Sequence, residues 1–478
     1  MRIRTMLALT AACVVAGSAP ARELVVAPEG DDAAAGTAAE PLRTLAAVGA
    51  LATNGDVCLV RPGRYLEPLR PAKSGRAGRP IRFMSATEGQ AVLARPDVPD
   101  GTGSVQVTAG AYGVDLTGRA QIEVQGFVLD GVGANMSGAR HCLLDGVTIR
   151  GVTAGRGAIA TNAVAATVSA ALVMGGSDNE FRGGTIAACD VAAVAMAPNS
   201  TGQRIVNSLI EDVGRRGDAA LFVAGVGAQV LHCTVRDCGG PALDAGGLRN
   251  GLIELNDLGG SGRAAAGTAL VTLDGDGRGT AVAWNWIHDA RGAGMSGLRL
   301  AGAQNLIVHH NVIWNIPGPA LRVEAPGGWH VIYHNTTWAA GVSVALVADA
   351  AGTNRLALIS CRFVNNLLPA GVETAPKVEM RLGLWQGNST NSAPGFVDAA
   401  AGDFRLTAQS PCVDAGAQAS EVLDEYAGTA PDPGAYELGH PAWVAGCERT
   451  ATAITWRVSA TNATEGSAED RGRRSDDR

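Results

Sequence analysis

Two arginines and an aspartate hold the same place in three short runs of similar sequence. Each run reads small residue, leucine, charged residue, apolar residue, and the charged residues are Asp244, Arg299 and Arg322. Because side chains alternate across a β-strand, the leucine and the apolar residue would face a core and the charged residue would face solvent. Paired arginines can bind carboxylate or sulfate groups, and elimination from a uronic acid needs its carboxylate neutralised and its C5 proton removed. These three residues are therefore the candidate catalytic residues.

A second set of residues is expected to line the same surface. Phe222, Val173 and Val271 take the outward place in further runs, and Glu324 stands two residues beyond Arg322 on the same face. The loops that lead into the runs add more charge. The predicted substrate-binding residues are Arg216, Asp218, Phe222, Arg263, Asp289, Arg291 and Glu324. The alternative is that these charges only keep the surface soluble and form weak ion pairs.

Two carboxylates follow one of these runs in the sequence Asp274-Gly275-Asp276. Oxygen ligands of this kind suit calcium, so Asp274 and Asp276 are the candidate metal ligands and calcium is the candidate cofactor. Asp-Gly-Asp-Gly is also an ordinary turn sequence. Both interpretations stay open at this point.

The elements that must position these residues repeat along the chain. Polar turn residues interrupt short apolar runs at Gly183, Asn207, His232, Asn256, Asn285, Asn311 and Asn335, with successive differences of 24, 25, 24, 29, 26 and 24 residues. Such a period is typical of solenoids. Three short strands per period, stacked ~4.8 Å apart, predict an all-β, right-handed parallel β-helix with three sheets and about ten coils.

Within this repeat, the asparagines and histidines are interpreted as structural. Asparagine tolerates corner geometry, and stacked side-chain amides can bond to one another from coil to coil. His310 and His334 hold the same position before a corner asparagine and are expected to form a surface stack. No acidic residue accompanies both at metal-ligand spacing, which disfavours a metal site.

Composition and the two ends of the chain indicate where the protein works. A net charge of -7 argues against a nucleic-acid surface. Arg2 and Arg4 precede the apolar residues 6–15 and the cleavage-site sequence Ala19-Pro20-Ala21, so residues 1–21 read as a signal peptide. The chain is expected to be secreted or periplasmic, monomeric and without a membrane span. Most cysteines are expected to be buried free thiols, and Cys412 with Cys447 is the one candidate disulfide.

Two flanking segments carry a resemblance to a known superfamily. The first includes Glu23-Leu24-Val25-Val26-Ala27-Pro28 and Gly55-Asp56-Val57, and the second includes Ser410-Pro411-Cys412-Val413-Asp414 and Pro431-Asp432-Pro433-Gly434. They resemble the ends of secreted right-handed β-helix proteins of the pectate-lyase-like superfamily. The resemblance implies an N-terminal cap over residues 22–105, repeats over 106–368, a closing segment over 369–440 and a tail over 441–478, its last part disordered.

The resemblance also implies a function. In this superfamily the sheet that carries Asp244, Arg299 and Arg322 forms a polysaccharide groove, and lyases neutralise the sugar carboxylate with calcium or basic residues and use lysine or arginine as base. No lysine lies between Lys73 and Lys377, and polygalacturonase motifs are missing. We therefore expect a carbohydrate-active protein that resembles a polysaccharide lyase and takes an acidic polysaccharide. A hydrolase is less favoured, and the alternative is a non-catalytic extracellular or cell-surface glycan-binding or structural β-helix protein.

Overall fold

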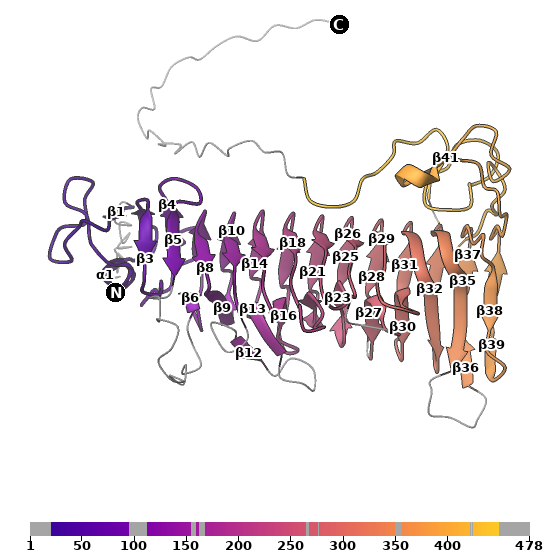
Figure 1. Cartoon of the computed structure of the whole chain (residues 1–478), viewed down its shortest axis with the longest axis horizontal. Coiled ribbons are helices and arrows are strands. Elements are labelled where there is room, and N and C mark those ends of the chain that lie inside the picture. The colour runs from indigo at the N-terminus through magenta and orange to yellow at the C-terminus, as the bar shows by residue number, and fades with distance from the viewer. Residues whose placement is uncertain are drawn as a thin grey trace, which may run out of the picture. The chain divides into compact units, whose positions relative to one another are not determined.

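The computed structural model describes residues 21–94, 112–153, 159–161, 168–263, 267–275, 277–348, 356–420, 422 and 424–448. These residues form a right-handed parallel β-helix, and Figure 1 shows its strands side by side. The predicted fold class is therefore confirmed. Residues up to Cys447 make one compact unit. The predicted signal peptide apart from its last residue, Asp276 and the chain after residue 448 lie outside the described residues.

The first face of the solenoid is a parallel sheet with one strand from each coil. Among the described residues it has 14 strands, more than the about ten coils predicted from the period, because the flanking segments wind in the same way as the repeat. In spatial order its strands are β1 (Glu23–Val26), β2 (Val57–Val60), β4 (Ile81–Ser85), β7 (Ile122–Gln125), β10 (Leu143–Asp145), β14 (Glu180–Arg182), β17 (Arg204–Val206), β21 (Gln229–Leu231), β25 (Leu252–Glu254), β28 (Ala281–Ala283), β31 (Ile307–His309), β34 (Val331–Tyr333), β37 (Arg362–Val364) and β40 (Leu384–Gln386).

The second face follows the first after a tight corner. It is built from β3 (Gly63–Tyr65), β5 (Ala91–Ala94), β8 (Val128–Asp130), β11 (Thr148–Arg150), β15 (Thr185–Ala187), β18 (Leu209–Glu211), β22 (Thr234–Arg236), β26 (Asp257–Gly259), β29 (Trp286–His288) and the first halves of β32 (Val312–Ala325) and β35 (Thr336–Ala348).

The third face carries the predicted site. It is built from β6 (Tyr112–Asp115), β9 (Gly133–Arg140), β13 (Val168–Ser177), β16 (Ala192–Met196), β19 (Leu221–Phe222), β23 (Leu243–Asp244), β27 (Ala269–Asp274), β30 (Ser296–Ala301), the second halves of β32 and β35, and β38 (Val372–Thr374). The second and third faces count as one sheet because β32 and β35 run on through the corner between them.

Shorter elements complete the fold. Strand β12 (Ile159–Thr161) pairs antiparallel with β13, and small strands line the corner that returns to the first face. Helix α1 (Leu45–Leu51) lies near the N-terminal end, where Thr44 caps it and Leu45 and Val48 are buried. The remaining elements are β20 (Gly225–Val226), β24 (Leu248–Arg249), β33 (Gly327–Gly328), β36 (Leu356–Ile359), β39 (Val378–Arg381), the hairpin of β41 (Phe396–Asp398) and β42 (Asp403–Leu406), and the 3-10 turn Ala399–Ala401.

An asparagine ladder holds the corner between the first and second faces. Each amide nitrogen donates to the side-chain oxygen of the next asparagine at 2.8–2.9 Å, through Asn256, Asn285, Asn311, Asn335, Asn366 and Asn388. The predicted amide stack is therefore confirmed. The left-handed corner backbone belongs instead to the residue before each ladder asparagine, such as Trp284 at φ 51° and His310 at φ 54°.

Asn207 does not belong to this ladder, although the sequence grouped it with the others. It takes the left-handed backbone itself, at φ 47°, and the next residue, Ser208, is buried. The repeat marker at Asn207 therefore falls one residue early. Spacing alone could not separate the two roles because they are adjacent in sequence.

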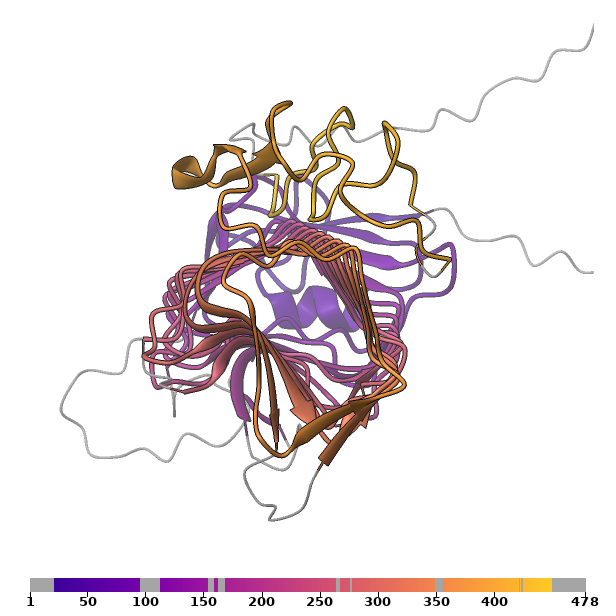
Figure 2. The same ribbon diagram turned by 90° about the vertical axis from the view of Figure 1, so that its right-hand side faces the viewer.

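Residues 396–447, apart from 421 and 423, cover part of the second face, and we call them the C-terminal strap. Figure 2 shows the strap as loops outside the wall of the solenoid. Its aromatic rings pack on a row of outward tryptophans: Trp314 lies 5.2 Å from Phe404, and Trp338 lies 5.3 Å from Phe396. His310 and His334 do stack, with ring centroids 5.1 Å apart, but His334 is buried beneath the strap rather than on the surface.

The eight cysteines of the described region are free. Cys412 lies beside Ser389, whereas the Cys447 amide donates to Thr234 on β22. These places are several coils apart, so the candidate Cys412–Cys447 disulfide is wrong. Among the described residues, no helix has the length and apolar character needed to cross a membrane.

Candidate functional site

Strand pairing sets one outward row along the third face. Phe222 pairs with Asp244, Asp244 with Thr272, Thr272 with Arg299, and Arg299 with Arg322. The sequence placed Asp244, Arg299 and Arg322 in this row, as the structure does. It placed Val271 there too, which is wrong: Val271 pairs with Leu243 and Leu298 and is fully buried.

Val173 also differs from expectation. It pairs with Ala195 on β16, a coil that the sequence alignment passed over, and Ala195 in turn pairs with Phe222. Val173 is buried in an apolar cluster on which Phe222 packs. The row therefore changes from apolar at β13 and β16 to polar between β23 and β32, where it carries Asp244, Thr272, Arg299 and Arg322.

Arg299 and Arg322 are both held by Glu324. Arg299 donates through two nitrogens to the two carboxylate oxygens at 2.9 and 2.8 Å, and Arg322 Nε donates to Oε1 at 2.6 Å. The Glu324 side chain is 6% exposed and the arginines are about one-third exposed. Burial alone would raise the pKa of Glu324, but the hydrogen bonds from Arg299 and Arg322 outweigh it and lower that pKa. Glu324 thus fixes two guanidinium groups, and the three side chains together carry a net positive charge.

Asp244 lies two strands from Arg299 in the same row, ~9.6 Å at the usual strand spacing. Its Oδ1 accepts a hydrogen bond from the Gly246 amide at 3.1 Å. Burial raises the pKa of Asp244, the nearby charge of Asp274 adds to the rise, and the Gly246 bond and Arg299 oppose it. Between Asp244 and Arg299 stands only the short side chain of Thr272 in this row. Asp244 is therefore a carboxyl group suited to proton transfer beside a positive pair.

The other predicted binding residues lie at the corner before the third face or in loops. Arg291 and Arg263 both pair with Asp237, at 2.7 and 3.6 Å. Asp289 accepts from Asn315 and contacts His288 at 2.7 Å. Arg216 and Asp218 are exposed in the loop before β19. The structure thus brings Asp244, Arg299, Arg322 and Glu324 together and gathers Arg263 and Arg291 around Asp237, which the sequence did not select.

His288 is interpreted from the sequence as structural together with the other histidines, but it has two acidic partners that the sequence did not assign to it. Its two ring nitrogens lie 2.7 Å from Asp257 and 2.7 Å from Asp289, and its ring stacks on Trp314 at 4.2 Å. Burial would lower the pKa of His288, but Asp257 and Asp289 outweigh it and the pKa is raised. Asp257 and His288 stand one coil apart, and that spacing was a signal that could have found them.

The structure does not test the calcium prediction. Asp274 is exposed and its Oδ1 accepts from the Gly275 amide at 2.6 Å, as in an ordinary turn. Asp276 lies outside the described residues. Within the described part of the chain, no group of three or more histidine, cysteine, aspartate or glutamate side chains is placed to hold a metal ion.

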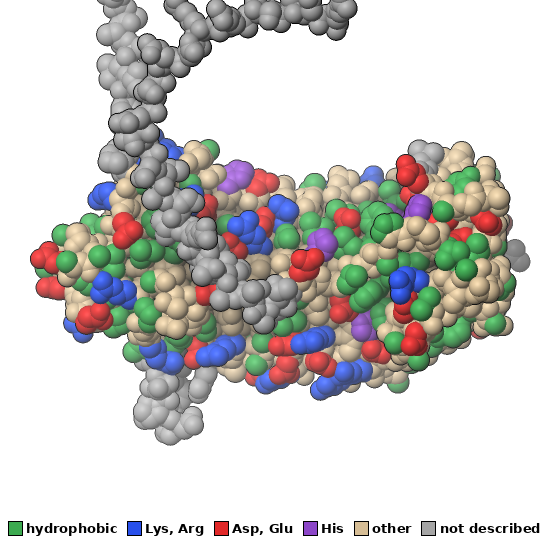
Figure 3. Space-filling view, turned by 90° about the horizontal axis from the view of Figure 1, so that it is seen from above, with side chains coloured by type: hydrophobic (Ala, Val, Ile, Leu, Met, Phe, Trp, Pro, Cys, Tyr) green, Lys and Arg blue, Asp and Glu red, His purple; other side chains and the backbone are tan. Residues whose placement is uncertain are grey.

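Many charged side chains elsewhere on the solenoid lie in pairs. Figure 3 shows acidic and basic groups next to one another on the face seen from above. Arg182 contacts Asp145 at 2.9 Å, and Arg236 contacts Glu211 at 2.8 Å. These pairs are largely exposed and each contributes at most about 1 kcal/mol to stability. The Arg299 and Arg322 pair differs because one buried carboxylate serves both.

Comparison with known proteins finds similarity only among solved structures. No family model matches the chain, and no curated protein matches it. The chain is similar to the pectate lyase Pel9A, with 17% identity over 88% of this chain and 97% of that one and a TM-score of 0.41. It is also similar to the PL6 family alginate lyase AlyGC, with 14% identity over 76% and 51% and a TM-score of 0.49. A third is the GH136 lacto-N-biosidase of Eubacterium ramulus, with 12% identity over 76% and 68% and a TM-score of 0.46. The likeness concerns the β-helix fold alone.

Proposed function

We propose that this protein is an exported carbohydrate-active protein that binds an acidic polysaccharide along the third face and cleaves it as a polysaccharide lyase. The observation that carries the proposal is the pair Arg299 and Arg322, fixed one coil apart by the buried carboxylate of Glu324. Donors already held in place lose little freedom when a sugar carboxylate arrives. A row of outward-facing side chains on successive strands also suits an extended polysaccharide chain.

The proposed chemistry uses the arginines and Asp244 together. Arg299 and Arg322 neutralise the uronate carboxylate, which makes the C5 proton more acidic. Asp244 in its ionised form removes that proton, the electron pair forms the C4–C5 double bond, and the C4–O bond breaks. The departing oxygen then takes a proton. A carboxylate whose pKa is raised by burial is a stronger base than an ordinary one, which supports Asp244 in this role.

The test is an assay of the purified protein on pectate, alginate and glycosaminoglycans, with and without calcium. Unsaturated product is followed by its absorbance. We expect product from at least one polymer and a fall in kcat/KM of about 100-fold or more in the Arg299→Ala, Arg322→Ala double variant. Arg236→Ala, which breaks an exposed pair on the second face, is the matched control and should keep full activity.

Two further variants separate the roles. Asp244→Asn should abolish product but keep polymer binding, whereas Glu324→Gln should weaken binding because the arginines lose their common acceptor. No product on any polymer, or full activity in the double arginine variant, would sink the lyase proposal.

The second candidate function is non-catalytic binding of an acidic glycan. The observation in its favour is that Glu324 already accepts from both arginines, as in a structural ion pair. Polymer binding that requires Arg299 and Arg322 without any product would support this alternative.

A further inference from the structure

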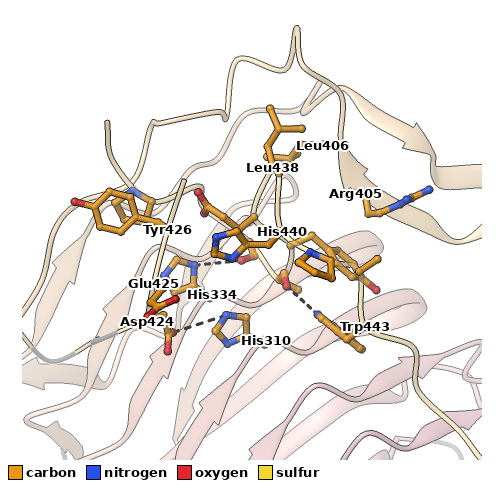
Figure 4. Close-up of a pocket in the computed structure, with 18 of the residues that line it drawn as sticks. His310, His334, Arg405, Leu406, Asp424, Glu425, Tyr426, Leu438, His440 and Trp443 are labelled. Carbon is orange, nitrogen blue, oxygen red and sulfur yellow. Dashed lines mark hydrogen bonds and ion pairs between the residues drawn. The ribbon is translucent and has the colours of Figure 1, made fainter. Parts of the chain in front are cut away.

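A cavity of about 390 Å³ lies between the C-terminal strap and the corner of the first and second faces (Figure 4). Its floor is a column of stacked rings from three successive coils: Trp284 lies 5.4 Å from His310, and His310 lies 5.1 Å from His334. Its roof comes from residues 424–426 and 434–443 of the strap. A cavity of this size suits a small ligand.

The cavity continues into a second one of about 290 Å³. The two share four lining residues, His334, Asp424, Tyr426 and Pro431. The combined cleft has room for more than one ring-sized unit. The cleft lies at the corner of the first and second faces, whereas the row that contains Arg299 lies on the third face.

The polar groups of the floor are neutral at ordinary pH. Burial lowers the pKa of His334 to about 4 and also holds the pKa of His310 well below its ordinary value. His334 donates from Nδ1 to the Gly434 carbonyl at 3.2 Å and accepts at Nε2 from the Asn365 amide at 3.3 Å. Both of its ring nitrogens are therefore engaged, and a ligand would meet His310 instead.

His310 and Asp424 face one another across a gap that is too long for a hydrogen bond. The distance from His310 Nε2 to Asp424 Oδ2 is 3.8 Å, and both side chains line the cavity (Figure 4). A hydroxyl group beside this gap could contact both atoms at once. Burial raises the pKa of Asp424, as expected of a carboxyl group that has lost water.

The charge of the cleft excludes acidic ligands. Asp424, Glu425 and Glu437 line the larger cavity. Arg405 is also among the lining residues, but it pairs with Asp403 at 2.5 Å and points away from the other labelled side chains in Figure 4. The surplus negative charge would repel a uronate or a sulfated sugar.

Aromatic rings supply the apolar surface of the cleft. Trp284, Tyr426, Tyr436 and Trp443 line it, and Tyr426 is 37% exposed. Flat rings of this kind pack against the C–H face of a sugar ring, while carboxylates and neutral imidazoles bond to its hydroxyls. We propose that this cleft is a second carbohydrate site, which binds an uncharged sugar of one or two units and is separate from the acidic-glycan row.

Saturation-transfer NMR at pH 7.5 tests the proposal with matched pairs of sugars, using the full chain with Arg299→Ala and Arg322→Ala so that the third-face row does not bind the acidic probes. The probes are glucose against glucuronate and galactose against galacturonate, with xylose and cellobiose as further uncharged ligands. We expect transfer to at least one uncharged sugar and a weaker signal from the acid of the same pair. Transfer to none of the uncharged sugars, or equal transfer to the acids, would overturn the proposal.

Substitutions locate the binding. Tyr426→Ala and Asp424→Ala should each raise the Kd for the sugar at least tenfold, and Asp424→Asn gives a shape-conserving variant if either of these unfolds. Trp385→Ala, an exposed aromatic on β40, is the control and should leave Kd unchanged. Arg299→Ala, Arg322→Ala should also keep sugar binding, so a failure of the proposed lyase function is distinguishable from a failure here. Unchanged affinity in both cleft variants would contradict the assignment.

Discussion

At the scale of single residues, asparagine has two different roles at two adjacent positions of the repeat, the left-handed corner residue and the ladder residue that follows it. Asn311 in the ladder donates to Val282, His309 and Asn335 and accepts from Asn285, and it is fully buried. Asn207 instead takes the left-handed corner backbone, at φ 47°, and lies outside the ladder. A buried amide that serves several partners is costly to remove, because each partner then loses its hydrogen bond without gaining water.

We expect Asn311→Ala to cost about 3 kcal/mol or more in the free energy of unfolding, since more than one buried polar group loses its partner. Asn207→Ala should cost less than Asn311→Ala, although a left-handed alanine adds about 1–2 kcal/mol of strain. Urea denaturation followed by circular dichroism measures both. Equal costs for the two variants would contradict the distinction between ladder and corner.

At the scale of elements, the repeat predicts the strands because local pattern decides them. Short apolar runs at a fixed period can bury their side chains only by stacking, so the coils, the amide ladder and the outward place of Asp244, Arg299 and Arg322 follow from sequence. Thr272 was missed because the residues of β27 fit the run pattern in two registers one residue apart. Only its pairing with Arg299 decides between them.

The C-terminal strap could not be predicted in the same way. Its contacts join residues far apart in sequence, such as His334 with Gly434 and Thr234 with Cys447, 100 and 213 positions apart. No periodic signal marks such pairs. The histidine stack was therefore predicted correctly but placed on the surface, and the cleft above it was not predicted.

The stability of the protein depends on pH through its buried histidines, of which His334 bonds to the strap. Burial lowers the pKa of His309, His330 and His334 to about 4, whereas the unfolded chain takes up these protons near the ordinary value of 6.5. The stabilisation is complete above pH 6.5 and is lost progressively as the pH falls toward 4. His288 acts in the opposite direction because its pKa is raised.

We therefore expect the thermal midpoint to fall between pH 7.5 and pH 4.5, and His334→Gln to reduce that fall. Scanning calorimetry at several pH values measures it. His141→Gln, at an exposed histidine, is the control. Burial would raise the pKa of Asp56, but hydrogen bonds from Arg22 and Thr53 outweigh it and lower that pKa to about 2. Asp56 therefore loses its contribution to stability only as the pH falls below its ordinary pKa of 3.8, outside the range from pH 7.5 to pH 4.5. An unchanged fall in His334→Gln would show that this histidine is not responsible.

At the scale of the whole molecule, the strap changes how the solenoid holds together. In a bare solenoid each coil contacts only its neighbours, and stability is a sum of local terms. Here one segment reaches from β22, through the Cys447 amide and Thr234, to the coil of β37, where Ala417 bonds to Asn365. Coils that are not neighbours are therefore coupled through the strap.

Trp443 is the residue that tests this coupling. Its ring stacks on Tyr436 at 4.9 Å and lies 6.3 Å from Trp286, and its indole nitrogen donates to the Ala435 carbonyl at 3.1 Å. We expect Trp443→Ala to cost about 2 kcal/mol, less than a fully buried tryptophan because the ring is half-buried. The loss of stability should spread over every coil that the strap contacts.

Hydrogen exchange measured by mass spectrometry distinguishes a spread loss from a local one. In Trp443→Ala, exchange should quicken in the strap and in β22, β26 and β29, while β2 and β4 keep their protection, because the strap makes its contacts over the later coils. Trp385→Ala, at the exposed edge strand β40, should change exchange only near itself. If Trp443→Ala quickened exchange in the strap alone, the coils beneath would be stable without it, and the solenoid would behave as a sum of independent neighbours.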